Sequence, residues 1–307
     1  MTFDISAEVS EALAAGRPVV ALETTVITHG MSFPDNLEIA VAMEEAVQAE
    51  QACPATIGIV KGRVTVGMQR HQIEAFAKAG RKRVLKCSRR DLPAVIASGA
   101  DGSLTVAGTV AVAFHAGIRL VATGGIGGVH RDRPQDVSAD LYELGRTPVV
   151  CVCSGAKSIL DLAATMEVLE SLGVPVIGLG TSNLPAFIAR DSGIPLTHYA
   201  NSVDETADVL RAWKDFDSTT GLLVTIPVPE NFAVPAEEAE IAIREAVLAA
   251  AEQGISGSAL TPYILQHVAT STDHRSTVAN KALLLNNART AARLARASGL
   301  GQPDGRI

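Results

Sequence analysis

Apolar and polar positions follow two different periods along this chain. Short apolar runs of strand length, rich in β-branched residues, recur up to about residue 226. Between most of them, apolar residues return every three or four positions, which is typical of amphipathic helices. We expect strands at Pro18–Leu22, Ile57–Val60, Arg83–Leu85, Ile118–Ala122, Pro148–Val152, Val174–Leu179 and Gly221–Ile226, and helices at Leu37–Ala49, Met68–Ala79, Thr105–Ala116, Lys157–Leu172, Val203–Phe216, Pro235–Gln253 and Val278–Ala297.

This alternation predicts the fold class. Strands that alternate with helices form βαβ units, so we expect an α/β fold with a mainly parallel central sheet flanked by helices. The 307 residues are 47% hydrophobic, which suffices for a large core. The sequence contains no linker-like tract rich in Ser, Gly or Pro and no internal repeat. We therefore expect one large domain over residues 1–307.

The composition narrows the class of partner. With 26 basic and 33 acidic residues the net charge is −7, and the chain has one Trp and three Tyr. A nucleic-acid binder usually has a basic surface and aromatic side chains for stacking, and both are weak here. The four cysteines form no CxxC pair, which favours buried, reduced thiols. No signal-peptide pattern opens the sequence, and its apolar runs are too short to span a bilayer. We expect a cytoplasmic protein that acts on a small molecule and binds neither nucleic acid nor membrane.

A glycine-rich run follows the strand predicted at Ile118–Ala122. The stretch TGGIGGVHRDRPQDVSAD begins at Thr123 and ends at Asp140. Its glycines allow either a tight structural turn or a close approach of backbone N–H groups to an anion. Thr123 and His130 flank these glycines and offer contacts to a phosphate or a hydroxyl. The spacing matches neither the dinucleotide-binding GxGxxG motif nor a P-loop.

Three polar residues at the end of this run have two interpretations. Asp136 and Asp140 are four positions apart and would share one face if a helix began here. Carboxylates suit Mg²⁺ or Mn²⁺ that is otherwise held by water. The alternative is that Asp136 or Ser138 caps the helix N-terminus.

Lys157 lies at the start of the helix predicted at Lys157–Leu172. The positive end of a helix dipole, together with burial, favours an uncharged amine, which is a nucleophile. The alternative is an ordinary surface lysine.

Glu23 and Lys86 both end predicted strands. In an α/β fold, residues at the carboxyl ends of the strands lie at the edge where ligands bind. Partial burial there would suit Glu23 to proton donation, although it could also be a hydrogen-bonded acid at a strand end. Lys86 could hold a phosphate as a point charge.

The sequence resembles the pseudouridine-5′-phosphate glycosidase family, which is also named for its association with indigoidine synthesis. The resemblance extends from about Val19 to Ala297. The stretches that carry it are ALETTVITHGM (21–31), KCSRRDLP (86–93), ATGGIGGVHR (122–131), DVSADL (136–141), SGAKSILDL (154–162), LTPYILQ (260–266) and AN…LLLNNA (279–288). Departures from the family pattern include Ser154, where alanine is common, and Lys281, where an apolar residue is expected.

The resemblance implies an enzyme of nucleotide metabolism, a glycosidase (hydrolase or lyase) of pseudouridine catabolism. It implies reversible cleavage of the C–C glycosidic bond of pseudouridine 5′-phosphate to uracil and ribose 5-phosphate. The reaction would pass through a lysine Schiff base with Mn²⁺ or another divalent cation, in a homotrimer. The implied residues are the nucleophile Lys157, the proton donor Glu23, the metal ligand Asp136, and the substrate contacts Lys86, Val106, Ser138, Ala139, Asp140, Thr123, His130 and Asn280.

Two rival functions share parts of this site. Another Schiff-base lyase or aldolase acting on a phosphosugar would also need Lys157 and a phosphate site. A non-catalytic phosphosugar-binding protein would need the glycines and Lys86, but no acid at Glu23. The residues alone lead to an α/β enzyme for a phosphorylated small molecule, and the named reaction comes from the resemblance.

Overall fold

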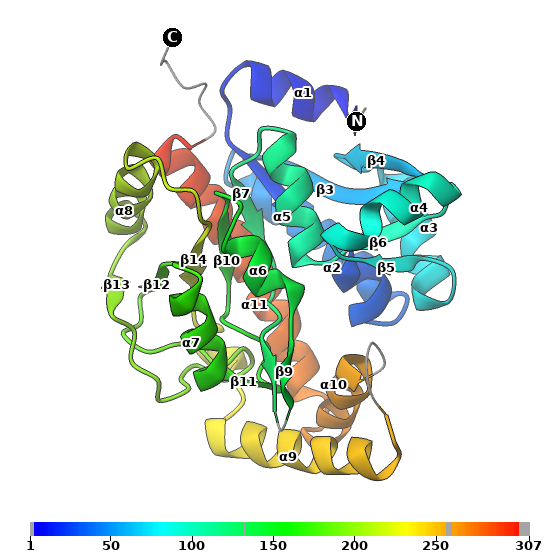
Figure 1. Cartoon of the computed structure of the whole chain (residues 1–307), viewed down its shortest axis with the longest axis vertical. Helices are drawn as coiled ribbons and strands as arrows, with labels where there is room; N and C mark the ends of the chain where they lie inside the picture. Colours follow the sequence, from blue (N-terminus) through cyan, green and yellow to red (C-terminus); the bar gives the residue numbers. More distant parts are fainter. Residues whose placement is uncertain (1–2, 132, 256–259, 301–307) are drawn as a thin grey trace.

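A large, mainly parallel sheet forms the centre of the computed structural model, which describes residues 3–131, 133–255 and 260–300 (Figure 1). The main strand order is β1 (Asp4–Ile5), β4 (Arg63–Val66), β3 (Cys53–Val60), β2 (Val19–Leu22), β7 (Leu120–Ala122), β10 (Val150–Cys153), β14 (Leu222–Thr225), β12 (Val176–Leu179) and β13 (His198–Ala200). Strand β3 also pairs with β6 (Gly102–Leu104), which in turn pairs with β5 (Leu85–Cys87). All pairs in this sheet are parallel except β3–β4 and β3–β6.

The apolar runs of the sequence become the buried middle of this sheet. Every residue of β2, β7, β10 and β14 is buried, as expected for parallel strands that are covered on both faces. Their parallel register brings the carboxyl ends of β2, β7 and β10 side by side, because Leu22 pairs with Ala122 and Ala122 with Val152. The predicted fold class is therefore confirmed. The antiparallel pairs of β3 were not predicted.

Helix α11 (Arg275–Ser298) connects distant parts of the chain. It crosses β2, β7 and β10 and packs beside α2 (Asp35–Ala49) and α8 (Val203–Asp215). Many of its buried residues are alanines, which let the helix approach the sheet closely. Helices α9 (Ala236–Glu252) and α10 (Leu260–Ser271) pack against each other at the lower edge of the molecule (Figure 1). The remaining α-helices are α1 (Ala7–Ala14), α3 (Arg70–Ala79), α4 (Leu92–Ser98), α5 (Val106–His115), α6 (Ala139–Leu144) and α7 (Leu162–Ser171).

The helix predicted to begin at Lys157 begins later. Asp161 caps α7, and its Oδ1 accepts a hydrogen bond from the Ala164 amide at 2.9 Å. Asp161 and the residue before it form strand β11 (Leu160–Asp161), which joins β8 (Val129–His130) and β9 (Arg133–Val137) in a small antiparallel sheet. Lys157 therefore lies in a turn, and the helix-dipole argument for its amine is wrong.

The four cysteines are buried and free, as predicted. Burial raises the pKa of Cys53 and of Cys87 to about 11, so both thiols stay protonated at neutral pH. None of the helices in the described ranges has the length and apolar character needed to cross a membrane.

Candidate active site

Glu23 lies where β2 ends, as predicted, and is 5% exposed. Its Oε1 accepts a hydrogen bond from the Thr123 hydroxyl at 2.6 Å, and its Oε2 accepts one from the Thr25 hydroxyl. Thr123 follows the neighbouring strand β7, so the adjacent ends of two strands hold one carboxyl group. Two donors on opposite oxygens fix the orientation of this acid.

The glycine run and the segment after β10 bind each other through their backbones. The Ser154 amide donates to the Gly124 carbonyl at 2.9 Å, and the Lys157 amide donates to the Ile126 carbonyl at 3.1 Å. Gly155 allows this path, because its φ of +81° is unfavourable for other residues and a Cβ there would lie 2.4 Å from the Pro185 carbonyl oxygen. The pairing holds half-buried Lys157 beside the glycine run.

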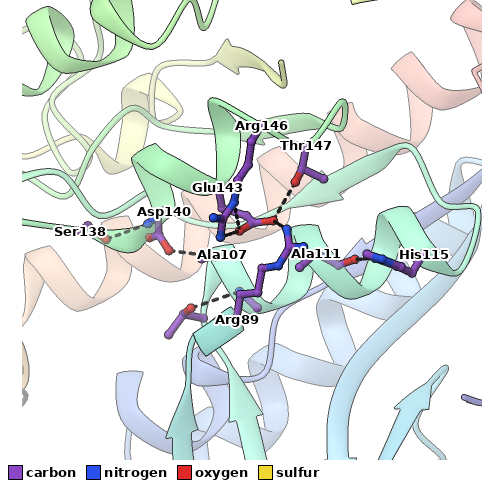
Figure 2. Close-up of polar contacts among 11 residues, drawn as sticks. Arg89, Ala107, Ala111, His115, Ser138, Asp140, Glu143, Arg146 and Thr147 are labelled. Carbon is purple, nitrogen blue, oxygen red and sulfur yellow. Dashed lines mark hydrogen bonds and ion pairs between the residues drawn. The ribbon is translucent and has the colours of Figure 1, made fainter. Parts of the chain in front are cut away.

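Asp140 links this run to helices α5 and α6. Its Oδ1 accepts from the Ala107 amide at 2.8 Å (Figure 2). Its Oδ2 accepts from the Gly127 amide at 2.8 Å. Residue 127 must be glycine, because a Cβ would lie 2.9 Å from that carboxylate and 2.2 Å from the Ser138 hydroxyl. Three predicted substrate contacts, Val106, Ser138 and Ala139, are chain neighbours of these groups at the starts of α5 and α6.

Helix α6 is also joined to the segment that follows Lys86. Glu143 is 1% exposed, and its carboxylate accepts from Arg89 Nη1 at 2.6 Å, Arg146 Nη2 at 2.6 Å and Thr147 Oγ1 at 2.7 Å. Figure 2 shows this carboxylate between the two guanidinium groups, on the same helix as Asp140. The predicted substrate contacts on α5, on α6 and before Arg89 therefore share one rigid support.

Lys86 interacts electrostatically with a second lysine and with two acids of the site. Lys86 lies within β5 and keeps a solvent-exposed surface, yet enough protein surrounds its ammonium to lower the pKa of this lysine, mainly through burial. The nearby Lys157 ammonium lowers it further, whereas the Asp140 and Glu23 carboxylates act in the opposite direction. Lys86 therefore lies within electrostatic range of the other three predicted site residues.

His29 belongs to the same region, and the sequence analysis missed it. Its Nδ1 lies 2.6 Å from the Thr28 hydroxyl and 3.3 Å from the Ser103 hydroxyl. Burial lowers the pKa of His29 to about 4, helped by the cationic Lys86 and Arg81 nearby. The imidazole is therefore neutral at physiological pH. The signal was present, because His29 lies in the ALETTVITHGM stretch.

A cavity of about 560 Å³ lies near this cluster, although Glu23, Lys86, Asp140 and Lys157 are not among the residues that line it. His29 and Arg81 line one part of it, and Ser158 and Ile159, which follow Lys157, line another. The predicted contact Asn280 lines it from α11. Lys281, the departure beside it, forms an ion pair with Asp35 at 2.9 Å. The cavity has the size of a small-molecule site.

Asn287 on α11 is a second residue of the site that was not predicted, and it supports two site segments. The fully buried amide of Asn287 on α11 donates to the Thr123 carbonyl at 2.9 Å and to the Ser154 hydroxyl at 3.1 Å. It therefore joins the residue that binds Glu23 to the segment that carries Lys157. The pattern of α11 gave one signal, because an amide here interrupts a run of leucines and alanines.

The prediction for Asp136 is only partly compatible with the fold. Asp136 is exposed on strand β9, whereas Asp140 is on α6, so they do not share a helix face. The α6 cap is Ser138, whose Oγ accepts from the Asp140 amide at 3.2 Å, as the alternative interpretation held. Within the described ranges, no three His, Cys, Asp or Glu side chains are grouped as metal ligands. The Asp136 carboxylate therefore fits a hydrated cation held largely by water, and not a cation enclosed by protein.

His130 lies beside the segment that carries Lys157. It is in β8, and its backbone pairs with Leu160, three residues after Lys157. Its side chain is half-buried.

Comparison with known proteins identifies the family. A family model described as "Indigoidine synthase A like protein" matches residues 8–297. The chain belongs to this family. Among similar members, a protein from Hahella chejuensis is 47% identical over 294 residues, which cover 95% of this chain and 97% of that one. Another from Herpetosiphon aurantiacus is 48% identical, covering 95% and 96%. Both are named pseudouridine-5′-phosphate glycosidase.

Solved structures similar to this member of the indigoidine synthase A-like family have the same fold. The prealnumycin C-glycosynthase AlnA, in complex with ribulose 5-phosphate, superposes with a TM-score of 0.89 at 38% identity over 97% of both chains. An indigoidine synthase A-like protein from Thermotoga maritima superposes with a TM-score of 0.87 at 34% identity over 96% of both chains.

Proposed function

We propose that this protein is a pseudouridine-5′-phosphate glycosidase, an enzyme of pseudouridine catabolism that reversibly cleaves its substrate to uracil and ribose 5-phosphate. The proposal is supported by the names of relatives that match nearly the whole chain, and by a C-glycosynthase of the same fold that binds a pentose phosphate. The observation that carries it is the electrostatic grouping of Lys86 with Lys157, Asp140 and Glu23. Lys86 also acts on His29, and Ser158 follows Lys157 in the chain; both His29 and Ser158 line the cavity.

The bond to be broken explains why an amine is needed. Ordinary glycosidases protonate a leaving oxygen or nitrogen and use two carboxylates. Here the leaving atom is carbon 5 of uracil, so its departure needs a stronger electron donor on the sugar side. After the ribose ring opens, the Lys157 amine, once its ammonium has given up a proton to water, adds to C1′, and its nitrogen lone pair expels the base as an iminium forms. Water then hydrolyses the imine, which releases ribose 5-phosphate and restores the amine.

Glu23 has the complementary task of protonation. Carbon 5 gains a proton as the C–C bond breaks, and a positioned acid lowers the barrier of that step. The hydrogen bonds from Thr25 and Thr123 keep the carboxyl group in one orientation. The proton is regained from the water that hydrolyses the imine.

Cations of the site suit the phosphate group. Lys86 and Arg81 bring positive charge to an otherwise acidic molecule. Asp136 would hold a hydrated Mn²⁺ or another divalent cation, whose charge would help to neutralise the phosphate. The adjacent substrate contacts would be Thr123, His130, Val106 and residues 138–140, with Asn280 across the cavity.

Assembly as a homotrimer in the cytoplasm is part of the same proposal. Buried, unpaired thiols agree with a reducing compartment. Exposed apolar side chains such as Leu85 and Leu248 agree with subunit contacts. Sedimentation equilibrium would measure the stoichiometry, and a monomer would contradict the trimer.

One assay tests the reaction. Pure protein, pseudouridine 5′-phosphate and Mn²⁺ should release uracil, followed by ultraviolet absorbance and chromatography, and a chelator should lower the rate. Borohydride with ribose 5-phosphate should label Lys157 in a peptide map.

The same experiments separate the rival functions. A label on Lys157 without uracil release would favour another Schiff-base phosphosugar enzyme. Binding of ribose 5-phosphate without turnover or label would favour a non-catalytic phosphosugar-binding protein. A label on another lysine would remove Lys157 from the mechanism.

A further inference from the structure

The turn that carries Lys157 separates two cavities. Ser158 and Ile159 line the cavity described above, of about 560 Å³. Ser158 and Leu160 also line a second cavity, of about 730 Å³, between β11 and α9. The side chains of Ile159 and Leu160 are buried in the hydrophobic core, which anchors the turn on that side. The carbonyl groups of the turn still need donors, and hydrogen bonds to them fix the direction of its backbone.

Arg131 supplies such hydrogen bonds from the next strand. It follows β8, and its guanidinium donates from Nη2 to the Ser158 carbonyl at 3.0 Å and from Nε to the Leu160 carbonyl at 3.2 Å. The two carbonyls flank Ile159 and belong to the first and third residues after Lys157. One planar group thus holds the turn at two points.

Glu240 on α9 fixes the guanidinium itself. Its Oε1 accepts from Arg131 Nη1 at 2.6 Å and its Oε2 accepts from Nη2 at 2.9 Å, a bidentate pair. The proximity of this guanidinium also lowers the pKa of Glu240. The carboxylate therefore stays ionised and keeps the guanidinium in the plane that reaches both carbonyls.

We infer that Arg131 is a positioning residue for Lys157, and that Glu240 holds Arg131 in its working orientation. This inference rests on the proposed function, in which the Lys157 amine must meet C1′ at bonding distance. A nucleophile displaced by about 1 Å can lose on the order of 10²-fold in rate. Arg131 acts through the turn and touches neither substrate nor reacting atoms.

Arginine is the side chain that this geometry requires. A lysine at 131 would keep the positive charge and could pair with Glu240, but a single ammonium cannot reach two carbonyls and a bidentate carboxylate in one plane. Arg131→Lys therefore preserves the charge and removes the two-point hold on the turn.

The test measures four quantities for Arg131→Lys and Arg131→Gln: kcat and KM for uracil release, the rate of borohydride labelling at Lys157 with saturating ribose 5-phosphate, and Tm. We expect kcat and the labelling rate to fall together by about 10- to 100-fold, with KM within about threefold of wild type. Tm should change little, because the pair is at the surface of the second cavity.

Glu240→Gln and Arg275→Gln complete the design. Glu240→Gln should lower kcat by about two- to tenfold and add nothing in the Arg131→Gln background, because both changes act through one guanidinium. Arg275 pairs with Glu238 on the same helix α9, and within the described ranges it forms no hydrogen bond or ion pair with the Lys157 turn. Arg275→Gln should therefore keep wild-type kcat and labelling.

Each contrary result has a distinct meaning. Wild-type kcat and labelling in Arg131→Lys would overturn the inference, and so would losses that only follow a fall in the folded fraction. A change confined to KM would mean that Arg131 binds substrate instead. Failure of the wild-type protein itself to form the adduct would overturn the proposed function, and this role with it.

Discussion

At the scale of single residues, the acid and the amine of the site are held by different means. Glu23 is buried and bonded by two hydroxyls, so its position is set by side chains. Lys157 is held through the backbone of its turn. Substitution of the acid should therefore leave its surroundings intact, which makes Glu23 a clean target for kinetics.

Glu23→Gln should lower the turnover of pseudouridine 5′-phosphate by about 10²–10⁴-fold, because an amide cannot deliver the proton that carbon 5 requires. Uracil release measures this loss. Glu44→Gln is the matched control, since the Glu44 carboxylate also accepts a threonine hydroxyl, from Thr56 at 2.6 Å, but lies outside the site. Near-normal turnover in Glu23→Gln would remove this acid from the mechanism.

His29 should make the stability of the protein depend on pH. Its pKa is about 4 in the folded protein and near 6.5 in the unfolded chain, so the folded state binds fewer protons between these values. The free energy of unfolding should therefore fall as the pH drops from about 6.5 towards 4, and the contribution of His29 is fully present above that range.

His29→Gln should make the decrease in unfolding free energy between pH 7 and pH 4.5 smaller, as measured by urea unfolding at both values. His198→Gln is the control, because His198 is exposed on β13. An unchanged pH dependence in His29→Gln would contradict the assigned burial and cationic surroundings of the imidazole.

At the scale of elements, α11 is the support on which two site segments depend. The Asn287 amide reaches the Thr123 and Gly124 carbonyls and the Ser154 hydroxyl from the buried face of this helix. Asn287→Ala would leave buried polar groups without this partner, which costs about 1–3 kcal/mol. Asn286→Ala changes the preceding, half-buried position, and its free energy of unfolding should stay within about 0.5 kcal/mol of that of wild type. Urea unfolding compares the two, and equal losses would contradict the role of the buried amide.

The sequence predicted those elements that obey one period throughout. Helix α2 and strand β2 have nearly the expected bounds, since a single apolar face or a continuous apolar run defines each. The predicted start of the helix at Lys157 was wrong, because the apolar residues that follow Lys157 also suit a short strand. Asp161, a helix cap, was read as a residue inside the helix. The pairing of β8 with β11 joins His130 to Leu160, about 30 residues apart, which local periodicity cannot reveal.

At the scale of the whole molecule, parallel register is what brings the site together. Glu23, Thr123 and Ser154 follow three adjacent strands, so their proximity could be predicted from a parallel sheet alone. The contributions of Asn287 and Arg131 could not, because they depend on how α11 packs on these strands and on where α9 places Glu240. The resemblance supplied the roles of Lys157 and Glu23, which no spacing in the sequence specifies.

Ligand binding should stabilise the whole folded chain. The site is built from β2, β5, β7, α5, α6 and α11, so unfolding of any one of these elements would destroy it. Ribose 5-phosphate at about 100 times its Kd should add about 2.7 kcal/mol and raise Tm by roughly 4–8 °C. Unphosphorylated ribose at the same concentration should raise Tm far less, because Lys86 and Arg81 favour an anion. Lys86→Met should reduce the shift with ribose 5-phosphate and leave that with ribose unchanged. Thermal unfolding measures all three, and equal shifts for the two sugars would contradict a phosphate site at these cations.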